Sequence, residues 1–174
     1  MMANFKELLP KINSFVFDVD GVLTDGSIFV TEKGEQLRTM NIRDGLAITM
    51  ALKKGYNIAI ISGGHSNSVL HRFNYLGIND IFIGVKDKVA VLHQYFKDKK
   101  IKPENVLYMG DDIPDYYAMK ECGVATCPKN AALEIKEIAH YISDKDGGKG
   151  CVRDIIEQVM RCNGDWFTPL ESIY

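Results

Sequence analysis

The chain has 174 residues, 46% of them hydrophobic, which suits one domain with a buried core. Its formal net charge of −2 argues against a basic surface for nucleic acid. No apolar run is long enough to span a membrane, the N-terminus lacks the pattern of a signal peptide, and the four cysteines form no CxxC pair, so we expect a cytoplasmic protein with free thiols and no structural zinc.

The predicted secondary structure alternates between short apolar strands and amphipathic helices. Apolar runs predict buried strands at 14–19, 57–62, 80–85, 105–111 and 124–127. Helical spacing of apolar residues predicts helices at 44–55, 65–77, 87–100, 115–123 and 150–164, and a helix that ends in a short edge strand at 130–142. Asp44 is the predicted N-cap and Gly55 the predicted C-cap of the first helix.

Residues 27–42 have two β-prone arms around the turn Glu32–Glu35, which predicts a β-hairpin. The alternation of strands and helices predicts an α/β fold, a Rossmann-like three-layer sandwich with a central, mainly parallel sheet. We expect one domain over residues 1–174, with a hairpin flap at about 26–42 and a C-terminal tail at 163–174. The segments between the strand ends are too short to fold as a separate cap domain.

Polar and charged residues follow the predicted strands where each strand ends. Ligands of open parallel sheets bind beyond the carboxyl ends of the strands, so these side chains are expected to meet. The set is Asp18, Asp20, Ser62, Lys88, Asp111, Asp112 and Asp115. Carboxylates gathered this closely repel one another unless a cation joins them, and oxygen ligands favour Mg²⁺. Asp18 and Asp111 are its predicted ligands.

This combination of groups suits phosphoryl transfer. A carboxylate that attacks a phosphate dianion faces like-charge repulsion, which Mg²⁺ and a lysine would neutralise. A serine hydroxyl and backbone N–H groups can hold the phosphate oxygens. A second carboxylate two residues after the first can give the leaving oxygen its proton and then take one from water.

The motifs DVDGVLTD, IISG, VKDK and GDDIPD, in this order over residues 15–115, resemble the four motifs of the haloacid dehalogenase superfamily of phosphatases. The resemblance implies that Asp18 is the nucleophile. It also implies that Asp20 is the general acid and base, with its backbone carbonyl on the metal.

The later motifs carry further implied roles. By the resemblance, Ser62 and Gly63 bind phosphate, and Lys88 stabilises charge. Asp111 becomes a metal ligand, and Asp115 orients Lys88 from behind. Asp112 either contacts the metal through water or is a solvated acid.

Two longer stretches narrow the resemblance. DGVLTDGSIFVTEKGEQLRTMNIRDGLAI and GGKGCVRDIIEQV resemble the 3-deoxy-D-manno-octulosonate 8-phosphate phosphatases. This family implies a Mg²⁺-dependent homotetramer in which hairpins of neighbouring subunits help to close each site. It also implies a small phosphorylated keto-acid sugar of eight carbons as substrate, in lipopolysaccharide synthesis.

One position departs from the family pattern. These phosphatases commonly carry arginine after the glycine of the second motif, and the related nine-carbon sugar phosphatases carry glutamate, whereas this chain has Gly64. The alternative substrate is therefore a nine-carbon, sialic-acid-like keto-deoxy-nonulosonate 9-phosphate. Arg43 favours the eight-carbon sugar as a partner for its carboxylate or a hydroxyl. Arg43 can equally form a surface ion pair with Asp44 or Glu35.

Other residues near the motifs have two possible roles each, one at the substrate and one in the structure. Thr24 either contacts substrate or shapes the loop beside the phosphate, and His65 either contacts substrate or faces solvent. The glycines around Lys149 form either a backbone nest near the site or a turn before the last helix. The apolar tail (Trp166, Phe167, Leu170 and Tyr174) packs either on its own domain or over a neighbouring subunit's site.

Rival classes fit the motifs less well. A signalling receiver domain places an adjacent acidic pair at its first strand, whereas here the alternating DxD comes first and Asp111-Asp112 comes late. A binding-only relative would lack the nucleophile or the proton-transfer acid, and both are present. A protein phosphatase is compatible with an uncapped site, while a nucleic-acid phosphatase would need a cationic surface.

Overall fold

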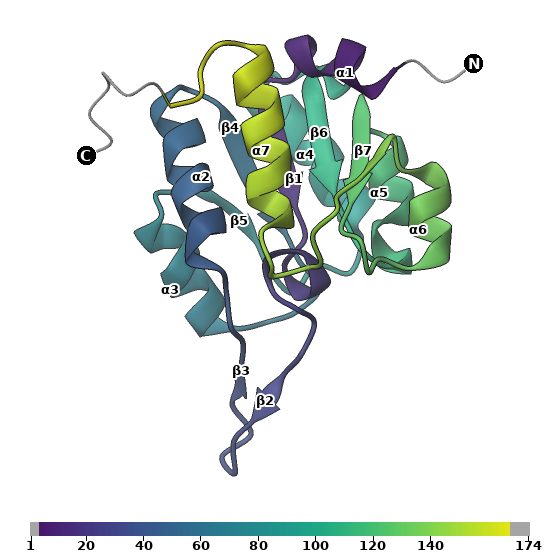
Figure 1. Cartoon of the computed structure of the whole chain (residues 1–174). Helices are drawn as coiled ribbons and strands as arrows, with labels where there is room; N and C mark the ends of the chain where they lie inside the picture. The colour runs from purple at the N-terminus through teal and green to yellow at the C-terminus, as the bar shows by residue number, and fades with distance from the viewer. Residues whose placement is uncertain (1–3, 168–174) are drawn as a thin grey trace.

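The computed structural model describes residues 4–167, in which six parallel strands form one sheet of order β5-β4-β1-β6-β7-β8 (Figure 1). The strands are β1 Ser14–Phe17, β4 Asn57–Ile61, β5 Asp80–Phe82, β6 Val106–Met109, β7 Val124–Cys127 and β8 Tyr141–Ile142. Every predicted strand is present, including the short edge strand at the end of 130–142. The predicted parallel α/β sandwich is confirmed.

Helices cover both faces of the sheet. The helices are α1 Phe5–Leu8, α2 Ile42–Lys53, α3 Asn67–Tyr75, α4 Lys88–Lys99, α5 Tyr116–Lys120, α6 Leu133–Ile138 and α7 Cys151–Cys162. Helices α2 and α7 lie side by side on one face, and their apolar residues join α3 in one core cluster. Helices α4, α5 and α6 pack on the other face in a second cluster.

The central strands bury both of their faces, which explains their unbroken apolar sequences. Successive side chains of a strand point to opposite faces, so Phe15 and Phe17 of β1 enter the first cluster while Val16 enters the second. Tyr108 of β6 likewise belongs to the second cluster. The interiors of β1, β4 and β6 are apolar, so the polar residues of the site stand just after these strands end.

A hairpin projects from the body of the molecule between β1 and α2 (Figure 1). Its strands are β2 Phe29–Val30 and β3 Gln36–Leu37, paired antiparallel as predicted. Gly34, with a φ of 78°, provides the left-handed residue that the turn requires. Between β1 and β4 the described chain holds only this hairpin, the turn Val19–Leu23 and α2, and between β4 and β5 only α3, so it carries no cap domain.

The predicted N-cap of α2 is wrong. Asn41 caps this helix, and its side chain accepts a hydrogen bond from the Arg43 N–H. Asp44 lies in the first turn instead, where it is buried and accepts a hydrogen bond of 2.7 Å from the N–H of Arg153. Asp44 therefore ties α2 to the first turn of α7. Gly55 has the positive φ expected just past a helix end.

Of the apolar tail residues that the structure describes, Trp166 packs on its own domain and Phe167 is exposed. Trp166 is buried against α7, with the guanidinium groups of Arg153 and Arg161 over its ring. Leu170 and Tyr174 of the tail prediction lie outside the described residues. Within residues 4–167, no helix has both the length and the apolar character needed to cross a bilayer.

Candidate active site

The carboxyl ends of three adjacent strands bring the predicted site residues together. Asp18 follows β1, Ser62 follows β4, and Asp111 follows β6, which are neighbours in the sheet. These residues line one cavity of about 590 Å³ together with Asp20, Gly63, Gly64, Lys88, Asp112 and Asp115. The pocket therefore unites the predicted aspartates, the serine and the lysine.

Lys88, the first residue of α4, is buried at the floor of this cavity. Its Nζ lies 3.0 Å from Asp18 Oδ1 and 2.7 Å from Asp115 Oδ1. Burial opposes the lysine charge, but the two carboxylates outweigh this effect and raise the pKa of Lys88. Lys88 is thus held as a cation beside Asp18, whose buried carboxylate it partly neutralises.

Tyr108 is a site residue that sequence analysis missed. Its buried hydroxyl donates a 2.7 Å hydrogen bond to Asp115 Oδ1, the same oxygen that accepts from Lys88. Tyr108 reads as an ordinary core residue of an apolar strand. Only its place opposite Asp115, seven residues later, gives the hydroxyl a function.

Three carboxylates of the cavity lie close enough together to bind one cation. Asp18, Asp111 and Asp115 each offer an oxygen within 4.8 Å of the others. Burial raises the pKa of Asp18 to about 7, with a further contribution from Asp115 that Lys88 opposes. Burial, followed by the charges of Asp18 and Asp115, raises the pKa of Asp111 to about 7. The protein alone therefore does not neutralise these acids, and a hard divalent cation such as Mg²⁺ fits the oxygen set.

The three carboxylates are not equally available to a metal. One oxygen of Asp115 already accepts from Lys88 and Tyr108. Asp18 and Asp111 keep more of their acceptor capacity, so they fit the metal best. Asp112 is exposed, caps the following turn by accepting from the Ile113 N–H, and also lines the cavity.

Close packing around these acids requires glycine. Gly21 has a φ of 87°, and a Cβ there would overlap the Asp111 carboxylate. A Cβ at Gly110 would likewise overlap Asp115. Gly21, which follows Asp20, and Gly110, which precedes Asp111, thus let the backbone pass directly beside the carboxylates.

The second motif forms the opposite wall. Ser62 is buried, and its Oγ accepts a 3.2 Å hydrogen bond from the Gly64 N–H. Gly63 is exposed and lines the same cavity. His65 is also exposed but faces a neighbouring groove under the hairpin. The structure therefore brings Ser62 and Gly63 into the cavity of the carboxylates and places His65 in the neighbouring groove.

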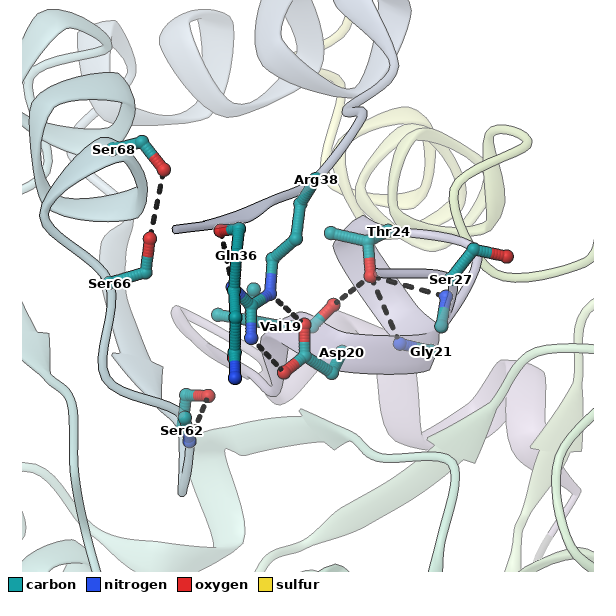
Figure 2. Close-up of polar contacts among 12 residues, drawn as sticks. Val19, Asp20, Gly21, Thr24, Ser27, Gln36, Arg38, Ser62, Ser66 and Ser68 are labelled. Carbon is teal, nitrogen blue, oxygen red and sulfur yellow. Dashed lines mark hydrogen bonds and ion pairs between the residues drawn. The ribbon is translucent and has the colours of Figure 1, made fainter. Parts of the chain in front are cut away.

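Two residues that were predicted to contact substrate, Thr24 and Arg43, do not line the cavity of Asp18. Thr24 is fully buried, and its Oγ1 accepts from the N–H groups of Gly21 and Gly26 while donating to the carbonyl of Val19 (Figure 2). Thr24 therefore shapes the loop, and burial excludes contact with substrate.

Arg43 is exposed and lines a different cleft, of about 450 Å³, beside α7. The described chain does not bring it to the cavity of Asp18. The ion pair foreseen for it with Asp44 is also excluded by position, because the Asp44 carboxylate is buried and turned to the α7 backbone.

The glycines around Lys149 support the site loop from behind. The Gly148 N–H donates to the carbonyl of Val22, and a Cβ at Gly147 would overlap the carbonyl of Gly21. These glycines therefore form a close backbone contact with the loop that carries Asp20. They do not line the cavity of Asp18.

Arg38 is the second residue that sequence analysis missed. It follows β3 in the hairpin and binds Asp20 through two parallel hydrogen bonds, from Nε to Oδ1 (2.6 Å) and from Nη2 to Oδ2 (3.0 Å) (Figure 2). The adjacent Asp20 raises the pKa of the guanidinium. A basic residue in a hairpin gives no local signal that it contacts an acid 18 positions earlier.

The comparisons with known proteins agree with this geometry. Residues 79–155 match the model of a family described as haloacid dehalogenase-like hydrolase. A 3-deoxy-D-manno-octulosonate 8-phosphate phosphatase from Yersinia pestis is 33% identical over 149 residues, which cover 86% of this chain and 80% of that protein.

Solved structures extend the similarity to the fold. A 3-deoxy-D-manno-octulosonate 8-phosphate phosphatase from Moraxella catarrhalis, in complex with magnesium ion, phosphate ion and KDO, has a TM-score of 0.91 and 32% identity. The match covers 95% of each chain. A cobalt-bound deoxy-D-mannose-octulosonate 8-phosphate phosphatase from Haemophilus influenzae has a TM-score of 0.87 and 30% identity, with 90% of this chain and 92% of that chain covered.

Proposed function

We propose that this chain, which belongs to the 3-deoxy-D-manno-octulosonate 8-phosphate phosphatases of the haloacid dehalogenase-like hydrolases, releases phosphate from that eight-carbon keto-acid sugar in lipopolysaccharide precursor synthesis. The enzyme is a phosphoric monoester hydrolase. The observation that carries the substrate proposal is the site itself, with Asp18, Lys88 and Ser62 in one cavity, in a chain that matches these phosphatases over most of its length.

Mg²⁺ is the cofactor that the residues fit. Asp18 and Asp111 would hold it through carboxylate oxygens, with the backbone carbonyl of Asp20 as the third protein ligand that the family resemblance implies. When bound, the ion supplies positive charge that offsets the phosphate dianion and the carboxylates around it. The cobalt-bound and magnesium-bound relatives support a divalent-cation site.

The first step forms an aspartyl-phosphate on Asp18. A carboxylate oxygen of Asp18 attacks phosphorus, and the bond between phosphorus and the sugar oxygen breaks. Lys88 lies 3.0 Å from Asp18, so it offsets the charge that gathers as nucleophile and phosphate approach. Ser62 and the N–H groups beside it hold the phosphate oxygens.

Asp20 acts as the general acid in the first step and as the general base in the second. In the first step it gives a proton to the departing sugar oxygen. In the second step it accepts a proton from the water that attacks phosphorus, and the bond to Asp18 breaks to release inorganic phosphate. Asp20 is half-buried at the mouth of the cavity, between bulk water and the reaction centre.

The assembly proposal rests on the hairpin. Its strands expose Phe29 (69% of its surface), Val30 (60%) and Leu37 (44%), which one copy of the chain leaves uncovered. We infer that neighbouring copies cover this surface in a homotetramer and help to close each site. The free cysteines, three of them buried, suit the reducing cytoplasm.

Two variants test the chemistry. Asp18→Asn should retain the fold and lose all measurable turnover, because an amide oxygen does not replace the nucleophile. Asp20→Asn should slow both steps and retain binding. Appreciable activity of Asp18→Asn would exclude the covalent route.

The substrate is tested by a steady-state comparison, with Mg²⁺, of phosphate release from the eight-carbon and nine-carbon keto-sugar phosphates. A preference of about a hundredfold or more for the eight-carbon sugar is expected, equivalent to about 2.7 kcal/mol. The nine-carbon sugar stays the alternative because Gly64 replaces the side chain that commonly distinguishes the two families. A preference for the nine-carbon sugar would therefore contradict the proposal.

A further inference from the structure

The hairpin brings a fixed guanidinium to the mouth of the active site. The side chain of Arg38 is only 4% exposed and is held by both oxygens of Asp20 and by the carbonyl of Gln36, the last at 3.2 Å (Figure 2). These bonds use three of the five N–H donors of a guanidinium, so donors are left for another anion. Asp20 itself keeps about a third of its side chain exposed, so an incoming group can reach the pair.

Arg38 connects two cavities. The first is the cavity of Asp18 and Asp20, and the second is a groove of about 580 Å³ between the hairpin and the start of α3. The groove is lined by Gly34, Glu35, Gln36, Leu37, His65, Ser66, Asn67 and Ser68. Arg38 bonds to Asp20 of the first cavity and to Gln36 of the second. Arg38 thus lies between residues that line the two cavities, so a substrate that extended from Asp18 into the groove would lie close to this guanidinium.

The space that Arg38 occupies is left free by Gly64. A Cβ on Gly64 would lie 3.1 Å from Asp20 Oδ2 and 3.3 Å from Arg38 Nη2. A longer side chain there would compete with the guanidinium for the same corner. The missing side chain at position 64 and the reach of Arg38 are therefore parts of one arrangement.

We propose that Arg38 is a specificity-determining residue that binds the carboxylate of the substrate and, in doing so, releases Asp20 for proton transfer. The proposal rests on the proposed function, because it needs a phosphorylated sugar acid. A planar guanidinium binds any carboxylate through the same paired hydrogen bonds, so a substrate carboxylate can take the place of Asp20. The exchange keeps one carboxylate on Arg38 at each stage, and the Asp20 carboxylate that is released can take up from water the proton that it later gives to the leaving oxygen.

This exchange couples recognition to catalysis. While Arg38 binds both oxygens of Asp20, each oxygen already accepts a hydrogen bond from a cation, which disfavours the protonated carboxyl that the leaving oxygen needs. A phosphate ester that lacks a carboxylate leaves this pair intact, so Asp20 works poorly on it. The keto-acid sugar opens the pair and gains an acid catalyst at the same time, which selects it over simpler sugar phosphates.

The test compares Arg38→Gln, Arg38→Lys and Arg43→Ala on two substrates. One is the eight-carbon keto-acid sugar phosphate and the other is an aldopentose 5-phosphate, which has no carboxylate. Arg38→Gln should lower kcat/KM about a hundredfold for the keto-acid sugar, with KM raised, and should raise it for the aldose phosphate, because Asp20 is then no longer held by the guanidinium. Arg38→Lys keeps the charge without the paired geometry and should recover about tenfold.

Arg43→Ala is the matched control, because it removes an arginine on the same segment that lies outside the cavity. It should leave both substrates within about twofold of the wild type. Equal losses on both substrates in Arg38→Gln would overturn the proposal, and so would loss of discrimination in Arg43→Ala alone. If the wild type itself does not prefer the keto-acid sugar, the proposed function fails first, and the role of Arg38 fails with it.

Discussion

Two buried tyrosines, one with a hydrogen-bonded hydroxyl and one without a partner for its hydroxyl among the described residues, allow a matched test of the site's hydrogen-bond network. Tyr108 is 0% exposed and donates a 2.7 Å hydrogen bond to the Asp115 carboxylate that also holds Lys88. Tyr95 is 2% exposed, and its hydroxyl has no hydrogen-bond partner among the described residues. Replacing either by phenylalanine removes one oxygen from the same helix-covered core.

The two substitutions should have opposite signs. A hydrogen bond to a charged group contributes about 1.5–3 kcal/mol, so Tyr108→Phe should lower the free energy of unfolding by about that amount. For a chain of this length the loss corresponds to a fall in melting temperature of about 3 to 12 °C. Tyr95→Phe removes a buried hydroxyl that lacks a partner, so it should be neutral or stabilise the protein by about 1 kcal/mol.

The assay is chemical denaturation followed by circular dichroism, with both variants and the wild type in the same buffer. Phosphate release measured alongside gives a second readout. Tyr108→Phe should lower kcat up to about tenfold at an unchanged KM, because Asp115 then holds Lys88 less firmly. Equal shifts in stability for the two variants, or an unchanged melting temperature for Tyr108→Phe, would refute the reasoning.

Three further predictions concern charge, packing and metal. Burial raises the pKa of Asp44 to about 6, above its ordinary 3.8, so the folded protein loses stability as pH rises between these values. Asp44→Asn should therefore be more stable than the wild type at pH 7.5, by up to about 3 kcal/mol, and the gain should shrink toward pH 4 in denaturation curves. Gly147→Ala should lower both the melting temperature and kcat/KM, because the added Cβ would overlap the carbonyl of Gly21 in the loop of Asp20. Gly164→Ala is the control: no atom lies near the added Cβ, so only the positive φ of residue 164 should lower the stability, and kcat/KM should not change. Removal of divalent cations with a chelator should abolish turnover, and added Mg²⁺ should restore it and raise the melting temperature; a protein whose melting temperature ignores Mg²⁺ would argue against the carboxylate site.

The local pattern of residues was enough to predict the strands and most helices. Apolar runs that end in acids marked β1 and β6, and their order placed Asp18 and Asp111 at one edge of a parallel sheet. The cap of α2 was misplaced because Asn41 and Asp44 are both good caps, and only the contact with Arg153 shows that Asp44 is used elsewhere. Local propensity does not distinguish two such residues three positions apart.

The sequence by itself determined the sheet and the set of groups at its edge, because period, turn residues and strand ends are local properties of the chain. The tertiary structure alone decided how those groups are partnered. The hydrogen bond of Tyr108, the close approach of Gly148 to the Thr24 backbone and the position of Arg38 over Asp20 all depend on residues that meet across separate turns and strands. Arg38 and Arg43 look equivalent in the sequence, yet one binds the active-site acid and the other faces α7. The physical reason is that side-chain partners are set by the packing of whole elements, which no short stretch of sequence encodes.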